Sequence, residues 1–316
     1  SHDWQGFIPI EHNPAEKNPP RGYVSSTNQH PATLAYPYYY TGFFAEDRSR
    51  RLAMLMQKDS LTVEDMKAFQ TDNYNIKAQD LLPLLLSQLD SSLADERQEQ
   101  VRNLLAEWDY MCDPDAAAPV AYQLWEDLMM EAIWGDELEG KKVLYPYKLA
   151  TIGILRDSLA FRFYDNIKTP AKESRSNLIQ STFAALTDSL FSYHENPEDW
   201  VWYAWKSTSI RHLLDRNGSL RAFSRMTIPI GGYKGILNAA SDPWGPSWRM
   251  IVHMTEKGPE AWGVYPGGQS GSPGSAHYDN FIDSWAAGDY YRLWFMKEAG
   301  EQDSIFVSKT HVQPGS

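Results

Sequence analysis

The chain has 316 residues, of which 42% are hydrophobic and 22% charged, so it can bury a large core and is composed like an ordinary folded protein. Its net charge of -12 and sequence pI of about 5.1 argue against nucleic-acid binding, which needs a basic surface to release phosphate counterions. Its one cysteine, Cys112, excludes an internal disulfide and a zinc site made of several thiolates, and the absence of an uninterrupted apolar run of about 18 residues predicts no membrane span.

Residues 1–47 are predicted to be mostly loop, with one short strand inside them. Pro19 and Pro20 cannot continue a β-ladder, and Gly22 allows a sharp turn. The β-prone run that follows ends at Asn28, just before another loop. An amide at a strand end can donate a hydrogen bond to a substrate, whereas an asparagine before a loop more often serves the turn, and the residues alone leave both interpretations open.

Helical signals dominate the next part of the chain. Thr62 is a good N-cap for a helix that would bury Met66 and Phe69. The apolar run at 81–89 contains Pro83, which we expect to break or start a helix. Apolar residues at helical spacing, with Gly135 and Asn217-Gly218 as end signals, predict the remaining helices at 48–57, 101–108, 119–134, 174–192 and 199–216.

The pattern changes after Gly218, where β-prone runs alternate with Gly, Pro and Asp turns. Strands are predicted at 220–228, 247–255, 261–265, 290–295 and 304–312. Helices followed by strands favour an α+β fold, with a helical lobe packed on antiparallel strands. We expect a single unit over residues 1–316, helix-rich at about 48–217 and strand-rich at about 218–312. Its sheet would begin near Tyr23 and resume after Gly218.

Several motifs occur in an order that resembles one known family. They are Trp4-Gln5-Gly6-Phe7-Ile8-Pro9, then Asn18-Pro19-Pro20-Arg21-Gly22-Tyr23 with Asn28, then Arg48-x-x-Arg51-Leu52-x-x-Leu55, Gln70-x-Asp72 and Pro266-Gly267-Gly268-Gln269-Ser270-Gly271. Together they resemble the β chain of the penicillin acylase (penicillin amidase) family of N-terminal-nucleophile hydrolases. The resemblance implies that residues 1–316 are a C-terminal fragment of such a β chain. Its strands would form part of an αββα sandwich that is incomplete here.

The resemblance also implies an activity. The parent enzyme would cleave an amide between a hydrophobic acyl group and an amine, in a substrate of the β-lactam or acyl-homoserine lactone type. An N-terminal serine outside this chain would attack the carbonyl, with its own α-amine managing the proton. Asn28 matches the oxyanion-hole asparagine and Arg48 the active-site arginine that orients it. The resemblance further implies a periplasmic location, and as partners an α subunit and the N-terminal part of the β chain.

Two alternatives stay open at this stage. Ser1 could itself be the nucleophile of a compact amidase, although Ser1-His2-Asp3-Trp4 does not continue as the family nucleophile usually does. The aromatic runs at 36–40 and 200–205 could instead line a saccharide groove of a non-catalytic binding protein, although core packing explains tryptophans at helical spacing more simply.

No cofactor and no metal are predicted. Some family members bind calcium through carboxylates, but the matching stretch here, 38–43, contains none. The histidines, His12, His212, His253 and His277 among them, lack metal-ligand spacing. Asp72 could be a catalytic carboxylate but is expected to pair locally. The glycine-rich loop at 267–271 lacks the Lys-[Ser/Thr] ending of a phosphate loop and is expected to be structural, near the active site.

Overall fold

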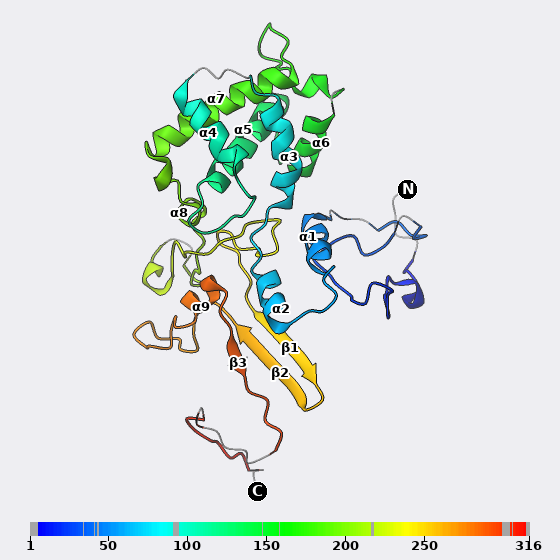
Figure 1. Ribbon diagram of the computed structural model, residues 1–316, viewed down its shortest axis with the longest axis vertical. Coiled ribbons are helices and arrows are strands. Elements are labelled where there is room, and N and C mark those ends of the chain that lie inside the picture. Colours follow the sequence, from blue (N-terminus) through cyan, green and yellow to red (C-terminus); the bar gives the residue numbers. More distant parts are fainter. Residues whose placement is uncertain are drawn as a thin grey trace.

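The computed structural model describes residues 6–33, 35–40, 42, 44–90, 95–146, 148–157, 159–215, 218–298, 304 and 306–313. Helices form an upper lobe, a small sheet lies below it, and the N-terminal segment lies to one side (Figure 1). The helices are α1 (Asp47–Leu55), α2 (Val63–Gln70), α3 (Ile76–Ser87), α4 (Glu96–Ala106), α5 (Ala118–Leu138), α6 (Lys148–Arg156), α7 (Arg175–Tyr193), α8 (Trp202–Lys206) and α9 (Ile282–Ala287). The strands are β1 (Arg249–Thr255), β2 (Gly258–Val264) and β3 (Tyr291–Leu293).

The helical lobe is built around α5. This helix packs against α7, α4 and α6, and most of its residues from Ala118 to Trp134 are buried. Trp125 is completely buried, lies 5.0 Å from the Phe183 ring of α7, and donates from its indole nitrogen to Thr182 Oγ1 at 3.1 Å. Burial of such large aromatic side chains stabilises the core, because apolar area is removed from water.

The sheet is antiparallel, in the order β1-β2-β3. Arg249 pairs with Val264, and Gly263 pairs with both Met250 and Tyr291. One face of the sheet is covered by α2, whose Gln70 donates from Nε2 to the Met250 carbonyl at 3.0 Å. A second, smaller core joins the sheet to α9 and to the preceding loops; it contains Ile228, Ile230, Ala240, Val264, Ile282 and Trp285.

The predicted α+β class, with helices before strands, is confirmed. Thr62 caps α2 as expected: its hydroxyl accepts from the Asp65 N–H, and the Asp65 carboxylate accepts from the Thr62 N–H. Met66 and Phe69 are only partly buried, however, because α2 lies on the sheet rather than inside the lobe. The helices expected at 119–134 and 174–192 are α5 and α7.

Three helix boundaries were predicted wrongly. The helix α3 runs through Pro83, whose side chain is exposed, so that solvent can replace the lost backbone hydrogen bond. The helix α5 continues past Gly135, because burial of Ile133 and Trp134 outweighs the roughly 1 kcal/mol that a helical glycine costs. The predicted helix 199–216 shrinks to α8 because Ser207 takes a left-handed conformation, φ 48°. Asn217 lies outside the described residues.

Other expectations about the strands and short helices were also wrong. No strand forms at 220–228, where the described residues make a 3₁₀ turn and a single bridge between Ile210 and Arg225. The described residues of 304–312 are irregular, and those of 23–28 form no strand. An extended segment becomes a strand only when a neighbour completes its hydrogen bonds, and no described strand lies beside 23–28. The helices α6 and α9 were not predicted.

Candidate active site around Asn28 and Arg48

Asn28 lies at a tight turn that its neighbours hold. The Gln29 side chain ties the turn by accepting from the Thr27 N–H at 2.6 Å and donating to the Ser25 carbonyl at 3.0 Å. Asn28 itself takes a left-handed conformation, φ 67°, which asparagine tolerates better than most residues. The turn therefore accounts for the choice of asparagine at this position and presents its side chain outward, where it is exposed.

The structure brings the two predicted site residues into contact. Arg48 lies in the first turn of α1 and donates from Nη2 to Asn28 Oδ1 at 2.5 Å. Burial lowers the pKa of Arg48, but a guanidinium stays protonated at any ordinary pH. A half-buried cation that donates to an amide oxygen makes a charge-assisted hydrogen bond, which is stronger than a neutral one.

This contact fixes which way the Asn28 amide faces. A guanidinium has only donors, so the amide oxygen must be the atom that meets Arg48. The Nδ2 group then points away from Arg48, and none of the residues that the structure describes accepts from it. The arrangement presents an amide donor whose orientation is set by a positive charge behind it.

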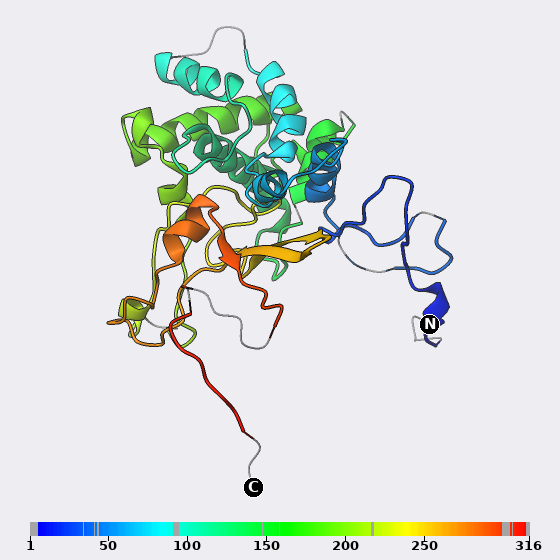
Figure 2. The ribbon, with the colours of Figure 1, turned by 60° about the horizontal axis from the view of Figure 1, so that its bottom comes forward.

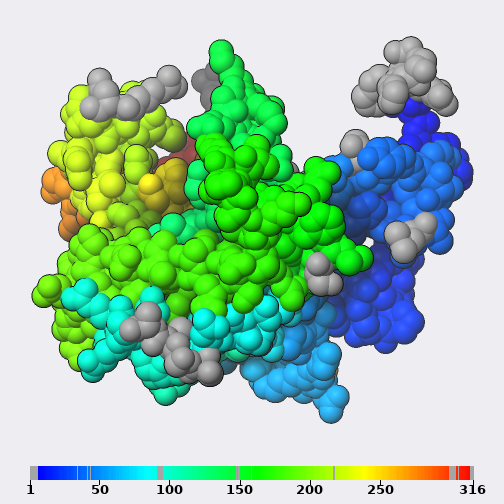
Figure 3. Space-filling view, turned by 90° about the horizontal axis from the view of Figure 1, so that it is seen from above, coloured from blue at the N-terminus to red at the C-terminus, as the bar shows by residue number. Residues whose placement is uncertain are grey.

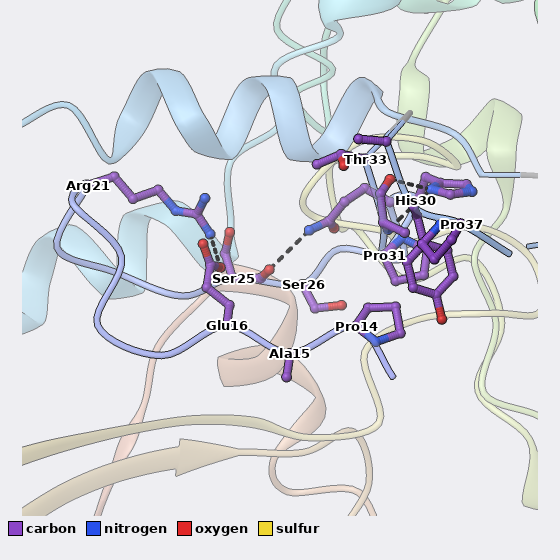
Figure 4. Close-up of a pocket in the computed structure, with 14 residues that line it drawn as sticks. Pro14, Ala15, Glu16, Arg21, Ser25, Ser26, His30, Pro31, Thr33 and Pro37 are labelled. Atoms are coloured by element: carbon purple, nitrogen blue, oxygen red, sulfur yellow. Dashed lines mark hydrogen bonds and ion pairs between the residues drawn. The ribbon is translucent and has the colours of Figure 1, made fainter. Parts of the chain in front are cut away.

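A hollow of about 690 Å³ adjoins this turn (Figure 4). It is lined by Ser25, Ser26 and Gln29 on the turn and by His30 beyond it. Arg21 and Glu16 form an ion pair at its rim, as the close-up shows. The rings of Tyr40 and Phe44 pack against His30, which holds this part of the N-terminal segment together. The lining is mixed, with proline and alanine surfaces beside a larger number of polar side chains.

Two other sequence expectations concern the glycine-rich loop at 267–271 and Ser1. Gly268 has no room for a side chain, because an added Cβ would lie 2.1 Å from the His277 carbonyl oxygen, so the loop at 267–271 is structural. In Figures 1 and 2 this orange loop lies across the sheet from the blue segment that carries Asn28, and its expected place near the active site stays a prediction. Ser1 lies outside the described residues.

A second arginine of α1, Arg51, was not predicted to be a site residue. Arg51 binds the Asp72 carboxylate and also lies over the Tyr74 ring, with its guanidinium carbon 4.1 Å from the ring centroid. Asp72 is thus paired locally, as expected, although it follows α2 rather than lying in it. Arg48 and Arg51 are three residues apart, a spacing that places them on neighbouring positions of one helix face.

No group of three or more metal-ligating side chains occurs in the part of the chain that the structure describes. His12 instead contacts Tyr38 Oη at 2.7 Å. No helix of the described residues is both long and apolar enough to cross a lipid bilayer.

Comparison with known proteins agrees with the resemblance noted in the sequence. Residues 1–302 match the family model described as penicillin amidase. An acyl-homoserine lactone acylase, QuiP, of Pseudomonas fluorescens strain Pf0-1 is 26% identical over 327 residues, which cover 92% of this chain and 39% of that protein. The QuiP of Pseudomonas aeruginosa strain PAO1 is 24% identical over 98% of this chain and 41% of its own length.

A solved structure shows the same fold. The thermostable penicillin G acylase of Alcaligenes faecalis superposes with a TM-score of 0.62 at 16% sequence identity, over 98% of this chain and 61% of its own. The chain described here therefore belongs to the penicillin amidase family. It spans about two fifths of the length of the curated relatives that it matches.

Proposed function

We propose that this chain is part of an acylase that hydrolyses the amide between a hydrophobic acyl group and an amine, with Asn28 as one donor of its oxyanion hole. The observation that carries the proposal is the hydrogen bond from Arg48 to Asn28 Oδ1, which leaves the amide N–H group free to meet a substrate. Family membership and the names of the QuiP relatives support amide substrates with acyl chains, including acyl-homoserine lactones, and the structural neighbour supports penicillins.

In this proposal each residue has one task. A serine nucleophile outside this chain attacks the carbonyl carbon, and its α-amine takes the proton and later returns it to the leaving amine. Negative charge then develops on the carbonyl oxygen, where Asn28 Nδ2 donates to it. Arg48 holds the amide in place and adds positive charge behind it. Water completes the cycle by hydrolysing the acyl-enzyme.

The proposal also assigns partners. The rest of the enzyme would comprise an α subunit and the N-terminal part of the β chain, since about three fifths of the QuiP relatives has no counterpart here. These parts would complete the acyl pocket beside Asn28 and supply strands next to residues 23–28. We extend the proposal to a periplasmic location, which the resemblance implies.

The saccharide-binding alternative receives less support from the geometry of the tryptophan run. Trp200 and Trp202 are buried in the helical core, so the run at 200–205 cannot present a row of rings to a saccharide. Trp202 also stacks on Trp205 at 5.3 Å, which is packing within the core. The other alternative, in which Ser1 is the nucleophile, is distinguished from the proposal by the experiment that follows.

The test compares the chain alone with the full-length enzyme. Both are incubated with a chromogenic phenylacetyl anilide and with a long-chain acyl anilide. We expect turnover by the full-length enzyme only, because the chain alone has Asn28 and Arg48 but not the nucleophile. Turnover by the chain alone that disappears in Ser1→Ala would overturn the proposal and assign Ser1 as the nucleophile. A full-length enzyme that cleaves neither anilide nor an acyl-homoserine lactone would also overturn it.

A further inference from the structure

The helix that carries Arg48 has no buried residue to hold it in place. Along α1 the apolar side chains Leu52 and Leu55 are only half-buried, and Met54 is exposed. Apolar packing alone therefore does not determine how α1 is rotated about its axis. Because Arg48 reaches Asn28 through a single hydrogen bond, a change in that rotation would remove it.

Ion pairs hold α1 instead. Arg51, one turn after Arg48, binds Asp72 through both Nε and Nη2, at 3.1 Å to Oδ1 and 2.7 Å to Oδ2. The side chains are 18% and 9% exposed, so solvent screens this pair less than a surface pair. The preceding residue, Arg50, binds Asp80 at 2.6 Å, but the side chains of this second pair are more exposed than those of Arg51 and Asp72.

Asp72 is itself fixed from the other side. Its Oδ1 accepts from the Tyr74 N–H at 3.2 Å, and its backbone carbonyl accepts from the Asn238 N–H at 3.0 Å. Asn238 is buried and accepts from Arg249 Nη2 at 2.8 Å, at the start of β1. The Arg249 guanidinium in turn donates from Nη1 to the Trp285 carbonyl of α9 at 2.6 Å. Polar contacts thus run without a break from α1 to the sheet.

We propose that Asp72 and Arg51 are positioning residues, which anchor α1 to the sheet in the rotation that places Arg48 on Asn28. The inference rests on the proposed function for its kinetic consequence but not for its structural one. The bidentate geometry matters because an aspartate that accepts two parallel bonds fixes the plane of the guanidinium as well as its distance. The Tyr74 ring lies against one face of the guanidinium and so limits its movement out of that plane.

The test uses Asp72→Asn in the full-length enzyme, with Asp279→Asn as its matched control. Asp279 also pairs with an arginine, Arg225, at 2.6 Å, and that guanidinium also lies over a tyrosine ring, at 5.0 Å, but the pair does not touch α1. We expect Asp72→Asn to lower kcat on the order of 10- to 100-fold with KM changed less than about twofold, since misplacement of a catalytic group has such effects. Asp279→Asn should leave kcat within about twofold.

A double-mutant cycle shows whether Asp72 acts through Arg48. In an Arg48→Ala background, Asp72→Asn should cost less than about twofold in kcat, because the group that it positions is gone. An undiminished loss in that background, or a normal kcat in Asp72→Asn, would overturn the inference. If Asp72→Asn does not fold, Arg51→Lys keeps the charge but loses the two-pronged contact, and the same cycle is run with it.

Hydrogen exchange separates this inference from the proposed function. In the 316-residue chain, Asp72→Asn should speed amide exchange in peptides that cover residues 47–55, whereas Asp279→Asn should not. If the full-length enzyme hydrolyses no acyl amide, the proposed function fails, and faster exchange in Asp72→Asn still supports the anchor. Unchanged exchange in both variants overturns the anchor whatever the activity.

Discussion

At the scale of single residues, Asn28 combines two properties that substitutions can separate. Its left-handed backbone suits a turn, and its amide, oriented by Arg48, suits an oxyanion donor. Aspartate replaces asparagine well in turns but carries no donor and adds a negative charge. The two properties therefore predict opposite results for the same variant.

We expect Asn28→Ala in the full-length enzyme to lose roughly 3–4 kcal/mol of transition-state stabilisation, mainly in kcat, with folding nearly intact. Asn28→Asp should be at least as damaging, because a carboxylate repels the developing oxyanion. Steady-state kinetics and melting temperatures of both variants provide the measurement. Near-normal turnover of Asn28→Asp, or unfolding of both variants, would show that Asn28 serves only the turn.

Lys206 is a second residue whose environment sets a measurable property. It is buried, and its Nζ donates to Thr208 Oγ1 and to the carbonyls of Gly231 and Ala240 at 3.0–3.1 Å, with no carboxylate partner in the described part of the chain. Burial lowers the pKa of Lys206 from its ordinary 10.5 to about 7. The nearby Cys112 thiol stays neutral, because burial raises its pKa to about 12.

The sign of the pH dependence follows from these values. Between pH 7 and 10.5 the unfolded chain binds more protons at Lys206 than the folded chain does, so the free energy of unfolding rises with pH across that window. The slope due to this one group is at most about 1.4 kcal/mol per pH unit. Below pH 7 both states are protonated, and the full penalty of burying the charge remains.

Urea unfolding at pH 7, 8, 9 and 10 measures this slope. We expect Lys206→Met to flatten the dependence relative to the parent chain. Lys257→Met, at the exposed turn between β1 and β2, should leave it unchanged and serves as the control. An identical slope in the parent chain and in Lys206→Met would show that this lysine keeps its proton when folded.

At the scale of secondary structure, α2 shows how a local signal determines an element. Its first turn is held by the reciprocal bonds of Thr62 and Asp65, and Lys58 also binds the Asp65 carboxylate at 2.7 Å. Hydrogen bonds from Lys58 and Thr62 hold the pKa of Asp65 at about 2. The helix therefore begins where the sequence places its cap, whatever lies beyond it.

Thr62→Ala removes that cap and should destabilise the chain by about 1 kcal/mol, whereas Thr62→Ser keeps the hydroxyl and should cost less. The pKa of Asp65 should rise in the alanine variant because one of its donors is lost. Chemical unfolding and an NMR titration of the Asp65 carboxyl measure the two effects. An unchanged pKa in Thr62→Ala would show that Lys58 and the backbone N–H of residue 62 hold the carboxylate charged without the hydroxyl.

At the scale of the whole molecule, one face of the sheet is left uncovered by the residues that the structure describes. Met250, Val252 and Met254 alternate along β1 and are 44–74% exposed, and Trp248 and Tyr291 extend the same apolar surface. The other face is covered by α2. Among the described strands β1 and β3 are both edges of the sheet. The N-terminal segment lies beside the helical lobe, as the space-filling view shows (Figure 3).

An exposed apolar face with an open edge should associate. We therefore expect the isolated chain to self-associate, or to bind the remaining part of the enzyme when the two are mixed. The double substitution Val252→Lys with Met254→Lys should weaken both, whereas Leu213→Lys, at an exposed loop residue outside the sheet, should not. Analytical ultracentrifugation and calorimetry provide the measurements. A stable monomer without affinity for the remaining part would contradict this expectation.

Much of the helical lobe could be predicted from the sequence, because its signals are local. The cap at Thr62 and the apolar stripes of α5 and α7 depend on residues within one or two turns of each other. The family resemblance likewise needed only short motifs in order, and it named Asn28 and Arg48, although their roles remain a proposal.

The contacts between distant segments could not be predicted this way. Whether α3 continues through Pro83 depends on which of its faces meets the lobe. The short α8 ends at Ser207, and its last residue, Lys206, donates to carbonyls more than twenty residues further along. The partner of Arg51, Asp72, is 21 residues away, and the contact of Arg48 with Asn28 spans 20.

Local propensity thus determined most of the long helices of the lobe, and the family resemblance named the candidates for the site. Only the tertiary structure decided that Asn28 is oriented by Arg48, that Arg51 is anchored through Asp72 to the sheet, and that Lys206 is buried without a counter-ion. The physical reason is that hydrogen bonds and ion pairs depend on distances of a few Å between groups, and the chain must fold before residues far apart in sequence reach those distances.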